Sequence, residues 1–134
     1  MDEIFTVARA RDLMPAVLDR AARLVAARAD LAELQADLRR GVPSPLGGLP
    51  EAKGLEATLS ELLGWFPGQG IEVKGLAPLL LDFPSVLDGE PVLLCWLEGD
   101  TELAWYHRLD CGFAGRRRIP SARQGRPAGP GESG

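Results

Sequence analysis

FTVARARDLMPAVLDRAARLVAARADLAELQADLRRGVP, residues 5–43, has the pattern of one long amphipathic helix. Its apolar residues recur at every third or fourth position over about four heptads, a spacing typical of a helix that packs along one side. This row is interrupted at Arg20 and comprises Ala10, Leu13, Val17, Leu24, Ala27, Leu31, Leu34 and Leu38. Thr6 is expected to cap the start of the helix and Gly41 to end it. Pro15 lies inside the pattern and predicts a kink or a break there.

A second apolar row on the same helix widens the surface that must be covered. It comprises Met14, Leu18, Val25 and Ala32. The ~25 residues after Pro15 span roughly 37 Å as a helix, whereas a compact globule of this chain length is roughly 36 Å across. Either the rest of the chain covers both rows, or a second copy does. We predict the second arrangement, a homodimer or a complex with a partner helix, formed through the first helix.

The remaining sequence predicts a second, shorter helix and then strands. Residues 41–49, GVPSPLGGL, have the composition of a loop, and Pro50 suits the first turn of a helix. This helix carries Leu55, Leu59, Leu62 and Leu63. From Ile71 onward the apolar residues form short strand-like runs, which lie at 71–73, 79–83, 91–97 and 102–107. The last two runs flank Gly99-Asp100, which predicts a C-terminal hairpin.

These patterns predict an α+β fold. A long N-terminal helical hairpin, coiled-coil-like in its spacing, is expected to pack on a small antiparallel β-sheet that ends in the C-terminal hairpin. Residues 1–119 are predicted to form a single domain, with the helical hairpin at 5–66 and the sheet at 71–119. Residues 120–134 have little to bury and are predicted to be a disordered tail.

Composition and charge exclude several classes of protein. The 134 residues are 46% hydrophobic and 25% charged, typical of one globular domain. The net charge is −4, and residues 116–134 hold five arginines but only one acidic residue, so the rest of the chain is strongly acidic. An acidic body repels phosphates, so neither a specific nucleic-acid partner nor a membrane partner is expected. The sequence shows no secretory signal and no spanning segment, which predicts a cytoplasmic protein.

A metal site is one alternative that the sequence raises. His107 is the only histidine, so any imidazole chemistry must use it. Cys95, His107 and Cys111 could bind zinc, although the paired C-x-x-C spacing is absent. A two-residue turn at Gly99-Asp100 would place Cys95 and His107 on opposite faces of the sheet, and a three-residue loop would place them on one face. A half-buried structural histidine is commoner, so we predict no metal and no cofactor, with this trio as the weaker alternative.

Two other features point to structure rather than chemistry. Cys95 lies in an apolar run without a neighbouring lysine, which predicts a buried, inert thiol rather than a nucleophile. Gly112–Arg116, GFAGR, could form a backbone nest for an anion. A tight turn that docks Phe113 into the core is the favoured interpretation.

Several segments are distinctive enough to carry a resemblance. They are Val73-Lys74 with Leu76, Leu80 with Asp82-Phe83-Pro84, Asp88-Gly89, Leu94-Cys95-Trp96, His107 and Gly112 to Arg116, preceded by Phe5-Thr6 and Leu13-Met14-Pro15. Through them, residues 5–119 resemble the bacterial family known as domain of unknown function family 2203. Three positions depart from that family's pattern: Gly75 replaces an Asp, Leu79 a Gly and Tyr106 a Trp.

The resemblance implies a helical hairpin with a sheet in a bacterial cytoplasm, and it implies no activity. It marks Asp82, Cys95, Trp96, His107 and Arg116 as the residues to test first. Polar side chains within apolar strands are also unusual choices for packing alone.

Two functions therefore stay open, and whether the protein is an enzyme stays open with them. The first is a self-associating or partner-binding module that uses the long helix. The second is a small enzyme, or a ligand- or metal-binding protein, with a site near Asp82, His107 and Arg116. In that site Arg116 would orient an anionic group, while His107 and Asp82 exchange a proton. The sequence does not identify a ligand.

Overall fold

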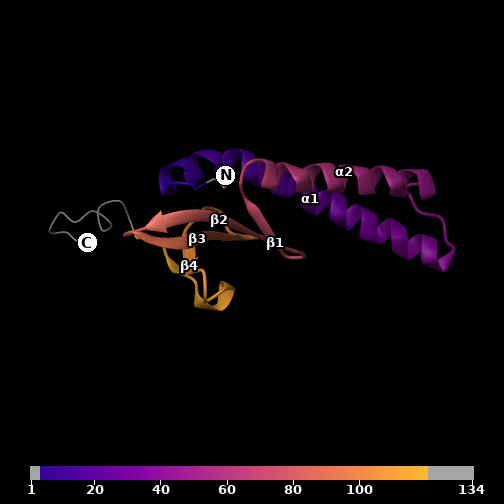
Figure 1. Ribbon diagram of the computed structural model, residues 1–134. Coiled ribbons are helices and arrows are strands. Elements are labelled where there is room, and N and C mark those ends of the chain that lie inside the picture. Colours follow the sequence, from indigo (N-terminus) through magenta and orange to yellow (C-terminus); the bar gives the residue numbers. More distant parts are fainter. Residues whose placement is uncertain (1–3, 121–134) are drawn as a thin grey trace.

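The computed structural model describes residues 4–120 and has two layers, a helical hairpin and an antiparallel sheet (Figure 1). The hairpin consists of α1 (Val7–Arg40) and α2 (Leu49–Gly68). The sheet consists of β1 (Glu72–Leu76), β2 (Leu79–Leu87), β3 (Glu90–Leu97), β4 (Trp105–Arg108) and β5 (Arg117–Arg118), with a short 3-10 helix, η1 (Phe113–Gly115), before β5. The predicted α+β fold is thereby confirmed. The tail predicted to be disordered lies, from residue 121 onward, outside the described residues.

Helix α1 follows the sequence pattern from one cap to the other. Thr6 Oγ1 accepts a hydrogen bond from the Arg9 amide at 3.0 Å. Gly41 ends the helix with a φ of 69°, a left-handed conformation that glycine adopts readily. The helix does not break at Pro15. Met14 and Val17, on either side of the proline, both belong to the hydrophobic core, and this packing holds the two parts of the helix together.

Helix α2 begins at the predicted place but continues further. Glu51 Oε1 accepts a hydrogen bond from the Gly48 amide at 2.8 Å, which satisfies a free N–H group at the start of the helix. The helix extends through Pro67 to Gly68. Phe66, near its end, is fully buried. Within residues 4–120, no helix is both long enough and apolar enough to cross a bilayer.

The five strands form an antiparallel meander in the order β1-β2-β3-β4-β5. A two-residue turn joins β2 to β3 at Asp88 and Gly89, whose φ angles of 52° and 78° are typical of tight hairpins. The predicted C-terminal hairpin is present as β3 and β4. Its connection is longer than Gly99-Asp100 alone, because Leu103 packs into the core before β4 begins at Trp105.

Two irregularities shape the sheet around β2. Strand β1 carries a β-bulge at Lys74, an extra residue in the pairing with β2. The pairing of β1 with β2 extends only to Asp82. Beyond it, the Phe5 amide donates a hydrogen bond to the Pro84 carbonyl at 2.7 Å. Pro84 is therefore tolerated in β2, because β1 no longer pairs with the strand there.

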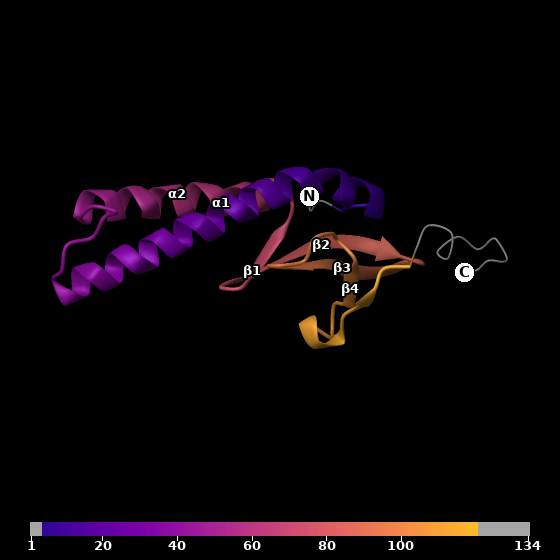
Figure 2. The same ribbon diagram turned by 180° about the vertical axis from the view of Figure 1, so that it is seen from behind.

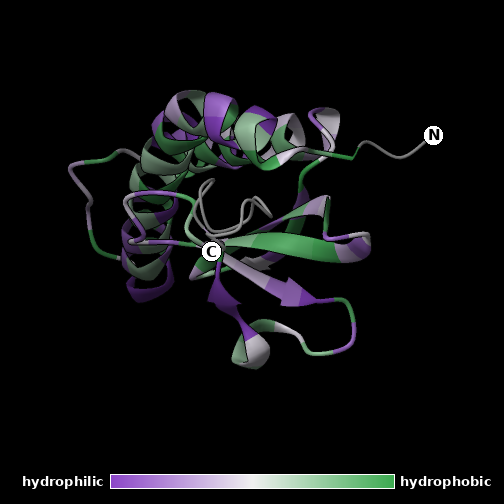
Figure 3. Ribbon diagram, turned by 90° about the vertical axis from the view of Figure 1, so that its left-hand side faces the viewer, coloured by the Kyte–Doolittle hydropathy of each residue, from purple (hydrophilic) through white to green (hydrophobic). Residues whose placement is uncertain are grey.

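The hydrophobic core lies between the helices and one face of the sheet. Figure 3 shows both helices on the same side of the sheet, and the β4–β5 edge of the sheet is the part farthest from them. The largest core side chains come from both layers and include Phe5, Val17, Leu24, Phe66, Leu81, Phe83, Leu94 and Trp96. We call the face of the sheet that packs against the helices the inner face, and the opposite face the outer face.

The two apolar rows of α1 differ in how well the chain covers them. In the first row, Val17, Leu24 and Leu34 are at most 1% exposed. In the second row, Leu18 and Val25 are only half-buried, and Ala32 is exposed. The distal part of the hairpin extends beyond the sheet (Figures 1 and 2). The chain itself therefore covers most of the first row, up to Leu34, but leaves Leu38 at its end 41% exposed, and it covers the second row only in part.

A salt bridge between Arg28 and Glu98 connects α1 to the end of β3. The Arg28 guanidinium donates two hydrogen bonds to the Glu98 carboxylate, at 2.9 and 2.8 Å. Glu98 Oε1 also accepts a hydrogen bond from the Leu79 amide at 2.8 Å. These contacts, led by the hydrogen bonds from Arg28, lower the pKa of Glu98 to about 2.

Candidate metal centre

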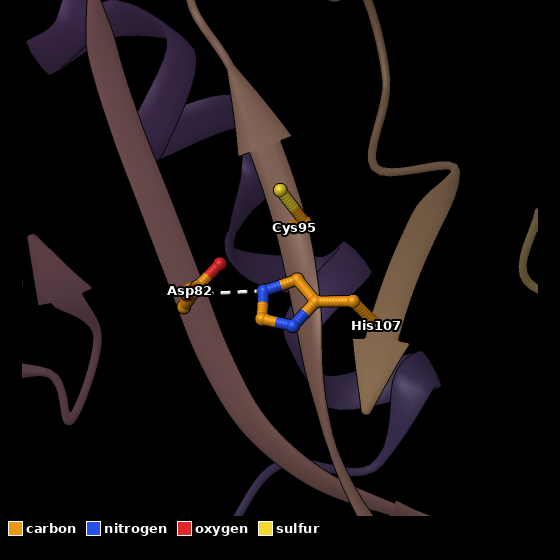
Figure 4. Close-up of side chains that lie close together, drawn as sticks. All are labelled: Asp82, Cys95 and His107. Carbon is orange, nitrogen blue, oxygen red and sulfur yellow. Dashed lines mark hydrogen bonds and ion pairs between the residues drawn. The ribbon is translucent and has the colours of Figure 1, made fainter. Parts of the chain in front are cut away.

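Three adjacent strands bring Asp82, Cys95 and His107 together on the outer face (Figure 4). Asp82 on β2 is the direct partner of Cys95 on β3, and His107 on β4 is the partner of Leu93. Since directly paired side chains share a face, and side chains two residues apart share it too, all three point the same way. The register between β3 and β4 is the one expected from a three-residue loop, so Cys95 and His107 lie on one face.

All three side chains are buried, although they lie on the side away from the helices. Their exposed fractions are 2% for Asp82, 0% for Cys95 and 4% for His107. The sulfur, one imidazole nitrogen and one carboxylate oxygen all lie within 4.8 Å of one another. The carboxylate, imidazole and sulfur of this group are the ligands that zinc and related metals use.

The hydrogen bonds of His107 leave one ring nitrogen facing a carboxylate. Nδ1 lies 2.8 Å from the carbonyl oxygen of Arg108. A carbonyl only accepts, so Nδ1 carries the hydrogen, and Nε2 of the neutral ring presents a lone pair. Nε2 lies 3.3 Å from Asp82 Oδ2, which is also an acceptor. Two acceptors that face each other need either a proton between them or a cation bound to both.

The Asp82 carboxylate has one satisfied oxygen and one unsatisfied oxygen. Oδ2 accepts a hydrogen bond from Lys74 Nζ at 3.0 Å, in addition to its contact with His107. Oδ1 is buried and has no hydrogen-bond partner among residues 4–120. A buried carboxylate oxygen without a partner is costly in free energy, which indicates a site where another group binds.

The thiol of Cys95 is held in its neutral form. Burial, together with the negative charge of Asp82, raises the pKa of Cys95 to about 11, against an opposing effect of the nearby Arg116 guanidinium. Nδ1 of His107 faces the Arg108 carbonyl and Nε2 faces Asp82 Oδ2, so the hydrogen bonds of the ring go to oxygens rather than to the thiol. A raised pKa is the opposite of what activates a cysteine nucleophile.

Arg116 lies beside this group, as the second functional hypothesis requires. Its guanidinium stacks over the rings of Trp105 and Phe113, 4.6 and 4.5 Å from their centroids, and its charge acts to lower the pKa of Cys95. It also forms a long contact of 3.4 Å with Asp100. The structure thus brings Asp82 and His107 together, with Arg116 packed on β4 at Trp105. A catalytic role for them stays a prediction.

The favoured expectation for residues 112–116 is not met, and two weaker alternatives that involved residues 111–116 are not supported either. Phe113 was expected in the core, but it is 40% exposed because its ring packs against the Arg116 guanidinium instead. The anion nest has few free donors, since the Gly115 and Arg116 amides donate to carbonyl oxygens within the same turn. Cys111 is exposed, and its sulfur lies near Asp110 Oδ1 at 3.6 Å rather than beside Cys95 and His107.

The sequence did not reveal two features of the site: the place of Asp82 among the potential metal ligands, and the presence of Lys74. Asp82 was singled out as a proton carrier, but the structure places it where Cys111 was expected in the metal group. Lys74 was not singled out, because the bulge that places it next to β2 has no clear sequence signal. Trp96, the remaining residue marked for testing, belongs to the core on the inner face, and its Nε1 donates to the Asp100 carbonyl at 3.0 Å.

Comparison with known proteins gives a family without an assigned activity. A family model described as "Uncharacterized conserved protein (DUF2203)" matches residues 3–119, which is most of the chain. No curated protein and no solved structure matches the chain.

Proposed function

The chain belongs to the DUF2203 family of uncharacterized conserved proteins, and we propose that it is a metal-binding protein that holds one zinc-type ion between Asp82, Cys95 and His107. The proposal depends on one observation above all. A buried imidazole lone pair and a buried carboxylate face each other beside a thiol, and one oxygen of that carboxylate has no partner among the described residues. A divalent cation would satisfy all of these groups at once.

The donor set favours zinc or a similar transition metal. Sulfur and imidazole ligands suit zinc and cobalt, whereas magnesium and calcium prefer oxygen. A carboxylate and a thiolate together balance the charge of a divalent ion. The carbonyl of Arg108, behind His107, would fix the orientation of the ring, as backbone carbonyls do behind many metal-binding histidines. Three protein ligands leave a fourth position open, which is typical of zinc sites that act on another molecule.

Lys74 supplies the positive charge next to Asp82 when no metal is bound. Desolvation lowers the pKa of Lys74, but its hydrogen bonds to Asp82 and Glu72 outweigh this effect and raise it. The ammonium lies 3.2 Å from the Glu72 carboxylate as well as 3.0 Å from Asp82. Lys74 can therefore stay paired with Glu72 when a metal ion takes over the charge of Asp82.

Zinc binding is expected to release the thiol proton and to strengthen with pH. Because the pKa of Cys95 is about 11, the thiol is protonated near pH 7, and each higher pH unit multiplies the thiolate fraction by about ten. The apparent affinity for zinc should rise about tenfold between pH 7 and pH 8. Calorimetric titration in buffers with different ionisation enthalpies measures both the affinity and the protons released.

Two matched cysteine variants make this experiment specific. Cys111→Ala should keep the pH dependence, because Cys111 is exposed and lies away from the site. Cys95→Ala should lose most of the affinity and the proton release. Equal zinc affinity in the two variants would contradict the proposal.

A second candidate function, self-association through α1, is supported by the surface of that helix. Leu18 and Val25 are half-buried. Together with Ala21 and Ala22 and with residues at the end of β3, they line a hollow of about 350 Å³. We propose that the corresponding face of a second copy covers this surface. Leu24 and Leu34 cannot serve this purpose, since the chain's own core buries them.

Light scattering across a concentration series tests the self-association. The wild-type protein is expected to have the mass of two chains, and a Leu18→Glu/Val25→Glu variant the mass of one, with an unchanged circular dichroism spectrum. Leu76→Glu, at an exposed leucine of β1, is the control and should stay dimeric. A wild-type protein that has the mass of one chain at every concentration would rule the dimer out.

A further inference from the structure

An apolar hollow lies on the outer face next to the candidate metal centre. It has a volume of about 350 Å³ and is lined by Gly75, Ala77, Pro78, Leu80, Leu97 and Phe113. This volume is at the lower end of the range for small-molecule sites. The hollow therefore suits a short apolar group rather than a large ligand.

The strand register places the hollow beside the centre. Leu80 is the direct partner of Leu97, just as Asp82 is the direct partner of Cys95. The two pairs are separated by two residues along each strand, which is about 7 Å, and they share the outer face. A molecule in the hollow would therefore lie within one residue pair of the centre.

Arg116 lies between the candidate metal centre, which is polar, and the apolar hollow. Its guanidinium packs on Phe113, which also lines the hollow, and it lies near enough to the Cys95 thiol to lower the pKa of that group. The stacking on Phe113 and Trp105 holds the guanidinium in place, and its contact with Asp100 is long, at 3.4 Å. A fixed guanidinium with donors available is well suited to a carboxylate.

Building on the proposed metal centre, we infer that the site binds a small organic carboxylate with a short apolar body. The carboxylate occupies the fourth position of the metal and accepts hydrogen bonds from Arg116. The apolar body fills the hollow between Leu80, Leu97 and Phe113. The Arg116 guanidinium has five N–H donors and makes only one long contact with Asp100, so it can donate to an anionic ligand as well.

Cobalt-substituted protein tests this inference, because the visible spectrum of cobalt(II) changes when a ligand enters its coordination sphere. Hexanoate is expected to change the spectrum and to saturate, with an affinity at least tenfold higher than that of acetate, which lacks the apolar body. Hexanol and hexylamine, which have the chain but not the carboxylate, should leave the spectrum unchanged.

Two pairs of variants locate the binding. Arg116→Gln should weaken hexanoate binding at least tenfold, whereas Arg118→Gln, at an exposed arginine that also stacks on Trp105, should not. Leu97→Asp should abolish the preference for hexanoate over acetate, whereas Val86→Asp, at an exposed position of β2, should keep it. All four variants should bind cobalt with the wild-type stoichiometry.

The possible outcomes separate the two proposals. If cobalt binds but hexanoate has no effect, or hexanol acts equally well, the carboxylate inference is wrong and the metal centre stands. If cobalt does not bind to the wild-type protein, the metal centre is wrong and the carboxylate inference falls with it.

Discussion

Replacing His107 by glutamine is expected to weaken zinc binding at least 100-fold. Glutamine has a similar size and can still donate to the Arg108 carbonyl, but it removes the ring nitrogen that faces Asp82. Only Asp82 and Cys95 would then stay as ligands, and two ligands do not hold zinc firmly. Calorimetric titration of the metal-free variant, beside the wild-type protein, gives both dissociation constants.

The folded state of the variant must be checked, because His107 is buried. Circular dichroism and a thermal melt of the metal-free proteins serve this purpose. Asp82→Asn, which keeps the shape of the side chain but removes its charge, should cause a comparable loss of zinc affinity. A His107→Gln protein that is folded and binds zinc within threefold of the wild-type affinity would contradict the assigned ligand set.

Replacing Phe66 by alanine is expected to lower the free energy of unfolding by about 3–5 kcal/mol, the usual cost of truncating a fully buried aromatic side chain. Phe66 is 0% exposed and lies near the end of α2. Its carbonyl also accepts a hydrogen bond from the Ile71 amide, which leads the chain into β1. The cavity would therefore open where the hairpin meets the sheet. Urea denaturation of the metal-free protein measures the loss.

Phe113→Ala is the matched control for this stability prediction. The same side chain is removed, but Phe113 is 40% exposed and packs on Arg116 rather than in the core. Its loss should cost less than about 1 kcal/mol. Similar losses in the two variants would mean that Phe66 is not part of the core that joins the two layers.

The helical layer could be predicted well because its signals are local. The spacing of the apolar residues in α1, the Thr6 cap and the Gly41 stop each act within a few residues of the chain. The length of α1 was also correct across Pro15, where a local rule expected an interruption. The prediction there was a kink or a break, and the continuous helix rules out only the break.

The sheet was harder to predict, because strand pairing depends on distant residues. The Asp88-Gly89 turn has a recognisable sequence signal, but Pro84 argued against a strand extending to Leu87. The proline is tolerated because β1 stops pairing with β2 at Asp82, so no neighbouring strand on that side needs an N–H at residue 84. Similarly, Leu103 lengthens the connection between β3 and β4 by packing into the core.

Prediction of the candidate site depended on the number of residues in one loop, the loop that joins β3 to β4. Whether Cys95 and His107 share a face is decided by the register of β3 against β4, and the sequence allowed both registers. Once the register is known, Asp82 completes the group as the direct partner of Cys95. Residue types therefore indicated the chemistry, and the pairing of the strands decided which of those residues meet.

X-ray absorption at the zinc edge is the measurement that examines the metal centre most directly. It should be made on untagged protein that has been loaded with one equivalent of zinc and then desalted. The spectrum is predicted to show one zinc per chain with a single sulfur ligand at about 2.3 Å, and nitrogen or oxygen ligands at about 2.0–2.2 Å. Loss of the zinc on desalting, or a first shell without sulfur, would contradict a centre built from Asp82, Cys95 and His107.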